Sequence, residues 1–66
     1  MKNDLPARRA ALGLSQAALG ESLGVSRQTI NSIEVGKYDP SLPLAIRLAR
    51  HFGCAVEDIF ELDGDA

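Results

Sequence analysis

The chain has 66 residues, 45% of them hydrophobic and 24% charged, with a formal net charge of −2. These proportions are typical of a folded protein, and the length allows a single domain, residues 1–66, that buries only about 60% of its unfolded surface. A core this thin leaves little room for a deep catalytic cleft, so a free-standing enzyme is not expected.

The composition also bears on location and on cofactors. No apolar stretch is long enough to span a membrane, and no apolar run follows the first four residues as it would in a signal peptide. The single cysteine, Cys54, cannot form an internal disulfide, and with the single histidine, His51, it cannot complete a zinc site. We therefore expect a cytoplasmic protein with no metal, no other cofactor, no small-molecule ligand and no membrane contact.

Five short helices are predicted from glycines that follow segments of helical period. In chain order they cover residues 5–12, 16–23, 27–35, 42–52 and 56–60. Short side chains with an acceptor oxygen precede the first four helices: Asp4, Ser15, Ser26 and Ser41. No alternating run of β-branched residues predicts a strand, so the predicted fold class is all-α, a compact five-helix bundle. Whether residues 1–3 and 61–63 pair as a short terminal β-ribbon stays open.

Apolar residues recur at helical spacing, which places them on single faces of these helices. The predicted core is Leu5, Leu14, Leu19, Leu23, Val25, Ile30, Ile33, Leu42, Ala45, Ile46, Leu48, Ala49, Phe52, Val56 and Ile59. Three apolar residues near the end exceed what a thin core needs, and we interpret them as dimer surface: Ile59, Phe60 and Leu62.

The informative stretch is residues 16–34, where two helices of about eight residues are joined by a tight turn at Gly24. This is the arrangement of a helix-turn-helix unit. Gly20 lies inside the second helix, where glycine costs up to about 1 kcal/mol against alanine, and we expect it to let the third helix cross closely. Val25 would fill the gap between the two helices.

The outward face of the third helix carries Arg27, Gln28, Asn31 and Ser32, with Thr29 near its edge. These are hydrogen-bonding groups of the kind that read base edges in DNA. On an isolated helix such residues would more often form a plain solvated face. Within a helix-turn-helix frame they indicate contact with the major groove.

The chain resembles the Cro/cI-type helix-turn-helix regulators, also called the Xre family, and most closely their small stand-alone members. The resemblance covers residues 5–60. The segments that follow the family's order are Leu14-Ser-Gln16, Gly24-Val-Ser26, Ile33-Glu34, Gly36-Lys37 and Pro40-Ser-Leu42. It implies a DNA-binding domain whose recognition helix is the third.

The resemblance also implies roles for particular residues. Base contacts are expected from Arg27, Gln28, Asn31 and Ser32, with Gln28 on an adenine and Arg27 on a guanine or a phosphate. Contacts with the DNA backbone are expected from Gln16, Ser26, Thr29, Lys37 and Tyr38. A partly buried salt bridge is expected between Arg9 and Glu34. Two alternatives stay open, since Tyr38 could pack on the fourth helix instead and Thr29 could serve helix packing.

Charge is distributed unevenly along the chain. Residues 1–53 hold all seven Lys and Arg with four acidic residues, whereas residues 54–66 hold five acidic residues and no basic one. Because phosphates would repel the acidic tail, about residues 61–66, we expect it on the far side from the recognition helix or along a partner subunit.

Taken together, the sequence predicts a homodimer that binds double-stranded DNA in a sequence-specific way and acts as a transcriptional repressor. Two recognition helices would enter successive major grooves about 34 Å apart on a near-palindromic operator. One alternative is an antitoxin or operon activator with the same fold and a protein partner. Another is a protein-interaction module that has lost DNA binding, which the acidic tail and the low positive charge would favour.

Overall fold

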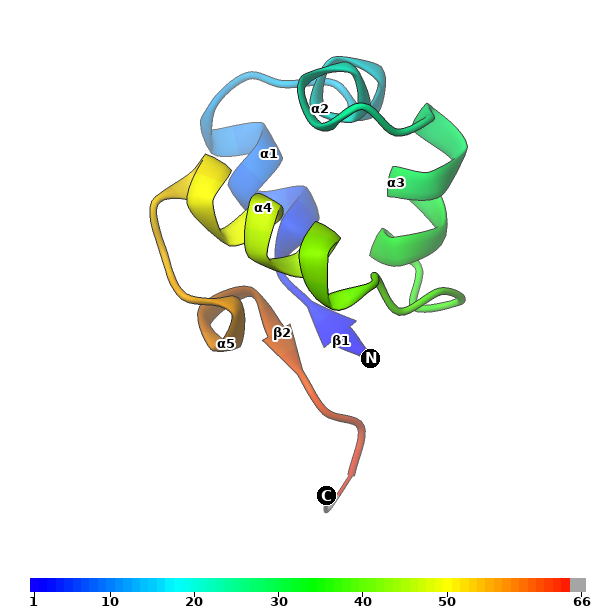
Figure 1. Ribbon diagram of the computed structural model, residues 1–66, viewed down its shortest axis with the longest axis vertical. Helices are drawn as coiled ribbons and strands as arrows, with labels where there is room; N and C mark the ends of the chain where they lie inside the picture. Colours follow the sequence, from blue (N-terminus) through cyan, green and yellow to red (C-terminus); the bar gives the residue numbers. More distant parts are fainter. Residues whose placement is uncertain (65–66) are drawn as a thin grey trace.

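Five helices and a two-stranded ribbon make up the part of the chain that the structure describes, residues 1–64 of a computed structural model (Figure 1). In chain order the elements are β1 (Lys2–Asn3), α1 (Leu5–Ala11), α2 (Gln16–Leu23), α3 (Arg27–Glu34), α4 (Leu42–Phe52), α5 (Val56–Ile59) and β2 (Phe60–Glu61). The prediction of an all-α fold with five helices is confirmed. Helices α1, α3 and α5 each end one residue earlier than predicted; α5 does so because Phe60 has extended backbone and enters β2.

Serine caps start three of the helices at the predicted places. The Oγ atoms of Ser15, Ser26 and Ser41 accept hydrogen bonds from the backbone N–H three residues later, at 3.0, 3.0 and 3.3 Å. Each bond satisfies one of the donors that a helix start leaves without a partner. Local sequence thus determines where α2, α3 and α4 begin.

The start of α1 differs from the prediction. Asp4 occupies the N-cap position, but its side chain makes no cap bond, because Oδ1 accepts from Nε of Arg8 at 2.9 Å instead. The backbone N–H of Leu5 donates to Oδ1 of Asn3 at 3.0 Å. The cap of α1 therefore comes from β1.

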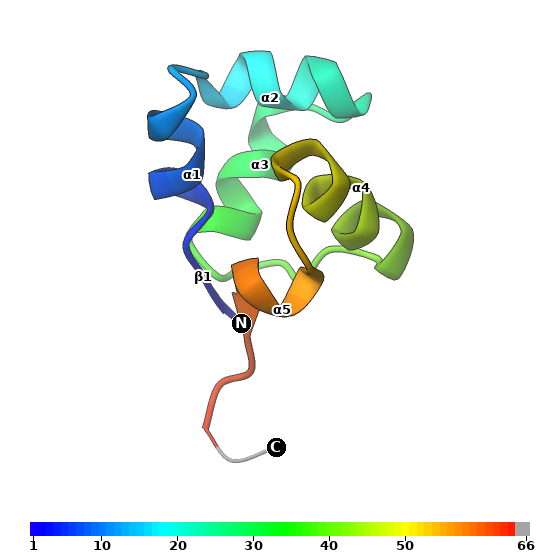
Figure 2. The same cartoon turned by 90° about the vertical axis from the view of Figure 1, so that its left-hand side faces the viewer.

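The two ends of the described chain pair with each other, which decides the question that the sequence left open. Strands β1 and β2 are antiparallel, with Lys2 opposite Glu61 and Asn3 opposite Phe60. The second strand begins at Phe60, one residue before the segment 61–63 that the sequence suggested, and so follows α5 directly. Figures 1 and 2 both show the ribbon beside α5, with the chain beyond it leaving the helical body at the end opposite α2. Of the acidic tail, Asp65 and Ala66 lie outside the described residues.

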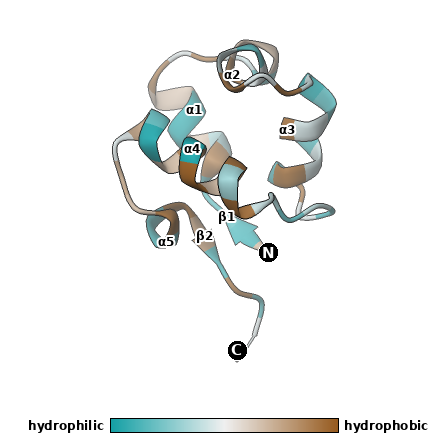
Figure 3. Cartoon of the chain, viewed as in Figure 1, coloured by the Kyte–Doolittle hydropathy of each residue, from teal (hydrophilic) through white to brown (hydrophobic). Residues whose placement is uncertain are grey.

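The core gathers residues from every helix and from β2. Its members, each less than 9% exposed, are Leu5, Leu19, Leu23, Ile30, Ile33, Leu44, Ala45, Leu48, Ala49, Ile59 and Phe60. Hydrophobic and hydrophilic bands alternate along α3 and α4, as expected for helices with one buried face (Figure 3). Full burial of each large side chain stabilises the fold by about 1.5–3 kcal/mol.

Helix α4 buries Ala45, Leu48 and Ala49 as predicted, but three other residues of this helix differ from the prediction. Leu42 is 69% exposed and Ile46 is 38% exposed, whereas Leu44, absent from the predicted core, is 7% exposed. The buried stripe runs through residues 44, 45, 48 and 49, while Leu42 at the first position of the helix and Ile46 at the edge of the stripe stay accessible.

The interpretation of Ile59 and Phe60 as dimer surface is wrong for this structure. Their exposed fractions are 3% and 7%, because α5 and β2 close one end of the core and direct both side chains inward. Only Leu62, 59% exposed just after β2, remains accessible among the three. Over residues 1–64, no helix is long and apolar enough to cross a membrane.

Candidate nucleic-acid interface

The turn between α2 and α3 depends on two glycines. Gly24 ends α2 in the left-handed conformation, with φ at 72°, where a side chain would be strained. A Cβ atom on Gly20 would lie 2.6 Å from the carbonyl oxygen of Val25 and 3.2 Å from the carbonyl carbon and oxygen of Ser26. The backbone of the turn therefore packs directly on α2, and this close approach fixes how α3 leaves α2.

Helix α3 has one buried and one accessible face. Ile30 and Ile33 are 0% and 1% exposed and anchor the helix in the core. Three of the predicted base-contacting residues, Arg27, Gln28 and Asn31, are exposed on the other side, and the fourth, Ser32, is half-buried. The structure thus brings onto one surface hydrogen-bonding side chains of the type that read bases.

The start of α3 and the loop after it enclose a shallow hollow of about 290 Å³. It is lined by Ser26, Gln28, Thr29, Ser32 and Tyr38. The loop folds back onto α3, because the backbone N–H groups of Lys37 and Tyr38 both donate to the carbonyl oxygen of Ser32, at 3.0 and 3.2 Å. Tyr38 therefore lies beside α3 with 46% of its surface exposed, and it is not buried against α4. Thr29 is half-buried, with its hydroxyl 3.0 Å from that of Ser26.

A forked ion pair ties α1 to the end of α3. Arg9 donates from Nε and Nη2 to the two carboxylate oxygens of Glu34 at 2.7 and 3.1 Å, and from Nη1 to the carbonyl oxygen of Leu14 at 2.9 Å. The side chains of Arg9 and Glu34 are 19% and 5% exposed. Burial by itself would raise the pKa of Glu34, but hydrogen bonds from Arg9 and Gln16 and the charge of Arg9 outweigh it and lower that pKa. Glu34 is consequently ionised at neutral pH.

Gln16 extends this network to the exposed face of α3. Its Nε2 atom donates to Oε1 of Glu34 at 2.9 Å and to Oδ1 of Asn31 at 3.1 Å. Both protons of that amide are then in use. A contact between this amide nitrogen and a DNA phosphate would require one of these bonds to open.

Sequence reasoning missed two side chains that hold helix ends. Nη2 of Arg47 on α4 donates to the carbonyl oxygen of Leu23, at the end of α2. Nδ2 of Asn3 donates to the carbonyl oxygens of Ile33 and Glu34 at 3.0 and 3.5 Å, at the end of α3. Both bonds satisfy carbonyl groups that a helix end leaves without a partner. Each joins residues 24 or more positions apart, so no spacing in the sequence could indicate it.

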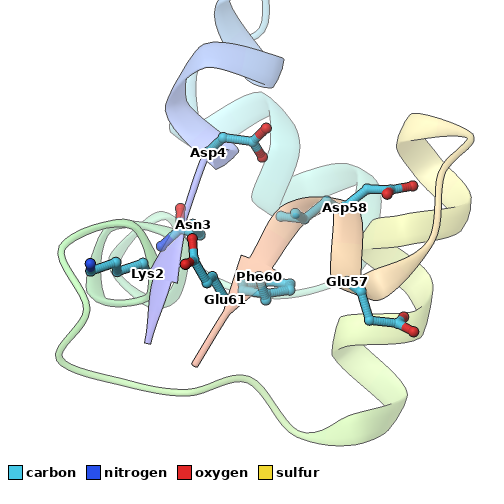
Figure 4. A pocket seen from close by; sticks show the side chains of 8 residues that line it. Lys2, Asn3, Asp4, Glu57, Asp58, Phe60 and Glu61 are labelled. Atoms are coloured by element: carbon cyan, nitrogen blue, oxygen red, sulfur yellow. The ribbon is translucent and has the colours of Figure 1, made fainter. Parts of the chain in front are cut away.

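The end of the molecule that carries the ribbon is acidic. A hollow of about 470 Å³ there is lined by Lys2, Asn3, Asp4, Glu57, Asp58, Ile59, Phe60 and Glu61. Figure 4 shows the carboxylate side chains spread around the ribbon, with Lys2 projecting away from it. Among the described residues, no group of three or more His, Cys, Asp or Glu side chains could hold a metal ion. This acidic end lies away from the start of α3 (Figure 1).

Comparison with known proteins agrees with this geometry. A family model described as Helix-turn-helix matches residues 7–59. An uncharacterized HTH-type transcriptional regulator of Methanocaldococcus jannaschii is 55% identical over 65 residues, which cover 98% of each chain. YgzD of Bacillus subtilis, with the same description, is 48% identical over 63 residues, 96% of each chain. A relative so described in Methanothermobacter thermautotrophicus is 50% identical over 66 residues, 98% of this chain and 96% of the relative. The chain belongs to the Cro/cI-type helix-turn-helix family of DNA-binding transcriptional regulators.

Proposed function

We propose that this protein is a homodimeric transcriptional repressor that reads a near-palindromic operator through the major groove. The observation that carries the proposal is the exposed face of α3. Arg27, Gln28 and Asn31 project there from a helix anchored by two buried isoleucines and fixed to α2 by a glycine contact. Such a face can donate to and accept from base edges while the rest of the domain stays folded behind it.

On this surface, one group of side chains would contact base edges and the residues around it would contact the DNA backbone. Gln28, Arg27, Asn31 and the half-buried Ser32 would contact base edges, each good bidentate pair contributing about 1–3 kcal/mol of discrimination. The groups proposed for the DNA backbone flank them: Gln16, Ser26, Thr29, Lys37 and Tyr38. Lys37 and Tyr38 are exposed in the loop that folds back on α3, where side chains can reach a phosphate beside the groove.

A dimer is proposed because one module reaches few phosphates, and two modules on half-sites about 34 Å apart would double the contacts. Leu62, just after β2, is the apolar side chain that we assign to the interface. Leu62→Glu is expected to weaken self-association. Leu12→Glu is its matched control, because Leu12 at the end of α1 is 57% exposed against 59% for Leu62. Sedimentation equilibrium measures both. Equal association constants for the two variants and the wild type would exclude Leu62 from a dimer interface.

The experiment that tests the proposed function is selection from a pool of random duplex DNA, with sequencing of the bound fraction. Enrichment of a near-palindrome with half-sites one helical turn apart is expected. A folded protein that enriches no sequence at low salt would contradict the proposal and would favour a protein-interaction module. Placing the enriched site upstream of a reporter gene then separates a repressor from an activator.

A further inference from the structure

Hydrogen-bond chemistry determines which way round the amide of Asn31 lies. The chain of contacts begins at Glu34, whose carboxylate is held by the two bonds from Arg9. An ionised carboxylate only accepts, so Gln16, 2.9 Å away, must present its NH₂ group to Glu34. The orientation of the Gln16 amide thus follows from its charged partner.

Gln16 in turn determines the orientation of a side chain on α3. The NH₂ group of Gln16 also lies 3.1 Å from the side chain of Asn31. Because that group only donates, the Asn31 atom that faces it must be the carbonyl oxygen. Nδ2 of Asn31 is then left on the exposed surface, where residues 1–64 provide no hydrogen-bond partner for its two protons.

We infer that Asn31 acts as a hydrogen-bond donor toward DNA and selects guanine in the operator. This inference rests on the proposed function and adds a base preference to it. Guanine presents two neighbouring acceptors, N7 and O6, in the major groove, which match the two free protons on Nδ2. Adenine places a donor beside its N7, and a contact with both atoms would need the Asn31 oxygen as well as Nδ2, but that oxygen is turned toward Gln16. Cytosine presents only a donor and meets no acceptor there.

Gln16 is a positioning residue in this arrangement. Arg9 holds the Glu34 carboxylate, and Gln16 donates both to that carboxylate and to Oδ1 of Asn31. The charge of Glu34 therefore determines which end of the Asn31 amide faces outward. Loss of the Gln16 amide would leave Asn31 free to rotate by half a turn and to present either its donor or its acceptor. The base preference would weaken while the fold remained.

The test needs the operator enriched by the selection and begins with the wild-type protein. The base pair read by Asn31 is the one at which Asn31→Ala loses discrimination. There the wild type should prefer guanine over adenine by about 5- to 100-fold in dissociation constant. Replacing that guanine by 7-deazaguanine, which lacks the N7 acceptor, should weaken wild-type binding and leave binding by Asn31→Ala unchanged.

Two variants test the polarity directly. Asn31→Asp has the same shape but only acceptors, so its preference at this position should move to cytosine, whose N4 group donates. Gln16→Leu should reduce the preference for guanine over adenine to less than threefold. In the Asn31→Ala background, Gln16→Leu should change affinity equally for all bases, which isolates any phosphate contact. Circular dichroism melting curves establish that each variant is folded.

The possible failures are distinguishable. If the wild type enriches no sequence, the proposed function fails and this inference falls with it. If an operator is enriched but the Asn31 position favours adenine, cytosine or thymine, the inference alone is overturned. An unchanged guanine preference in Gln16→Leu would equally overturn it, because Gln16 would not then orient Asn31.

Discussion

The substitution Gly20→Ala tests whether the close contact of the turn with α2 outweighs the better helix propensity of alanine. In an isolated helix this change would stabilise by up to about 1 kcal/mol. Here the added methyl carbon would lie 2.6 Å from the carbonyl oxygen of Val25, and the neighbouring atoms belong to backbone that cannot rotate away. Overpacking of this kind costs about 1–3 kcal/mol, and more when backbone must move. We expect net destabilisation of about 1–3 kcal/mol.

Thermal and urea unfolding followed by circular dichroism measure the effect of Gly20→Ala. For a domain of this size the melting temperature should fall by roughly 5–20 °C. Glu21→Ala, an exposed change in the same helix, is the matched control and should shift stability by less than about 0.5 kcal/mol. A melting temperature for Gly20→Ala equal to or above that of the wild type would refute the close approach of the turn to α2.

Three further changes test the contacts around α3. Glu34→Gln breaks the forked pair with Arg9 and should cost about 3 kcal/mol in urea unfolding; a double-mutant cycle with Arg9→Met gives the coupling. Because the pKa of Glu34 is lowered in the folded protein, its contribution is present above the usual value of 4.5 and is lost as pH falls through the folded value. Glu34→Gln should flatten that acid part of the stability profile, and an unchanged profile would contradict the assignment. Asn3→Ala should cost about 1–2 kcal/mol and raise amide exchange at the end of α3. Lys37→Ala should weaken binding to all DNA sequences and reduce the salt slope by about one, whereas an altered base preference would count against a phosphate contact.

Features with a local cause could be predicted from the sequence. Ser15, Ser26 and Ser41 cap helices at the predicted positions, because a cap bond joins residues only three apart. The need for glycine at position 20 could also be inferred, because a glycine inside a helix is costly unless something approaches closely. The helix-turn-helix unit and its accessible face follow from these signals.

Features with a tertiary cause could not be predicted. A two-residue strand carries no alternating pattern, so the pairing of Lys2–Asn3 with Phe60–Glu61 left no signal. The same ribbon draws Phe60 inward, which overturned its interpretation as dimer surface. On α4, apolar residues extend beyond the buried stripe, and only packing against the other helices decides that Leu44 is buried while Ile46 is exposed.

In the candidate site, the residue types and one of their mutual bonds could be predicted, but the bonds that link α2 to α3 could not. The family resemblance suggested that Arg9 and Glu34 pair, and the structure joins them. Nothing in the sequence indicated that Gln16 would bridge Glu34 and Asn31, because the three residues lie on two helices whose rotation depends on the whole core.

Gln28→Ala on the selected operator tests whether α3 reads bases. Fluorescence anisotropy would compare wild type and variant on the operator and on versions changed one base pair at a time. We predict that the variant loses discrimination at one position in each half-site, keeps it elsewhere, and retains the wild-type melting temperature. A folded Gln28→Ala protein with unchanged preference at every position would contradict the claim.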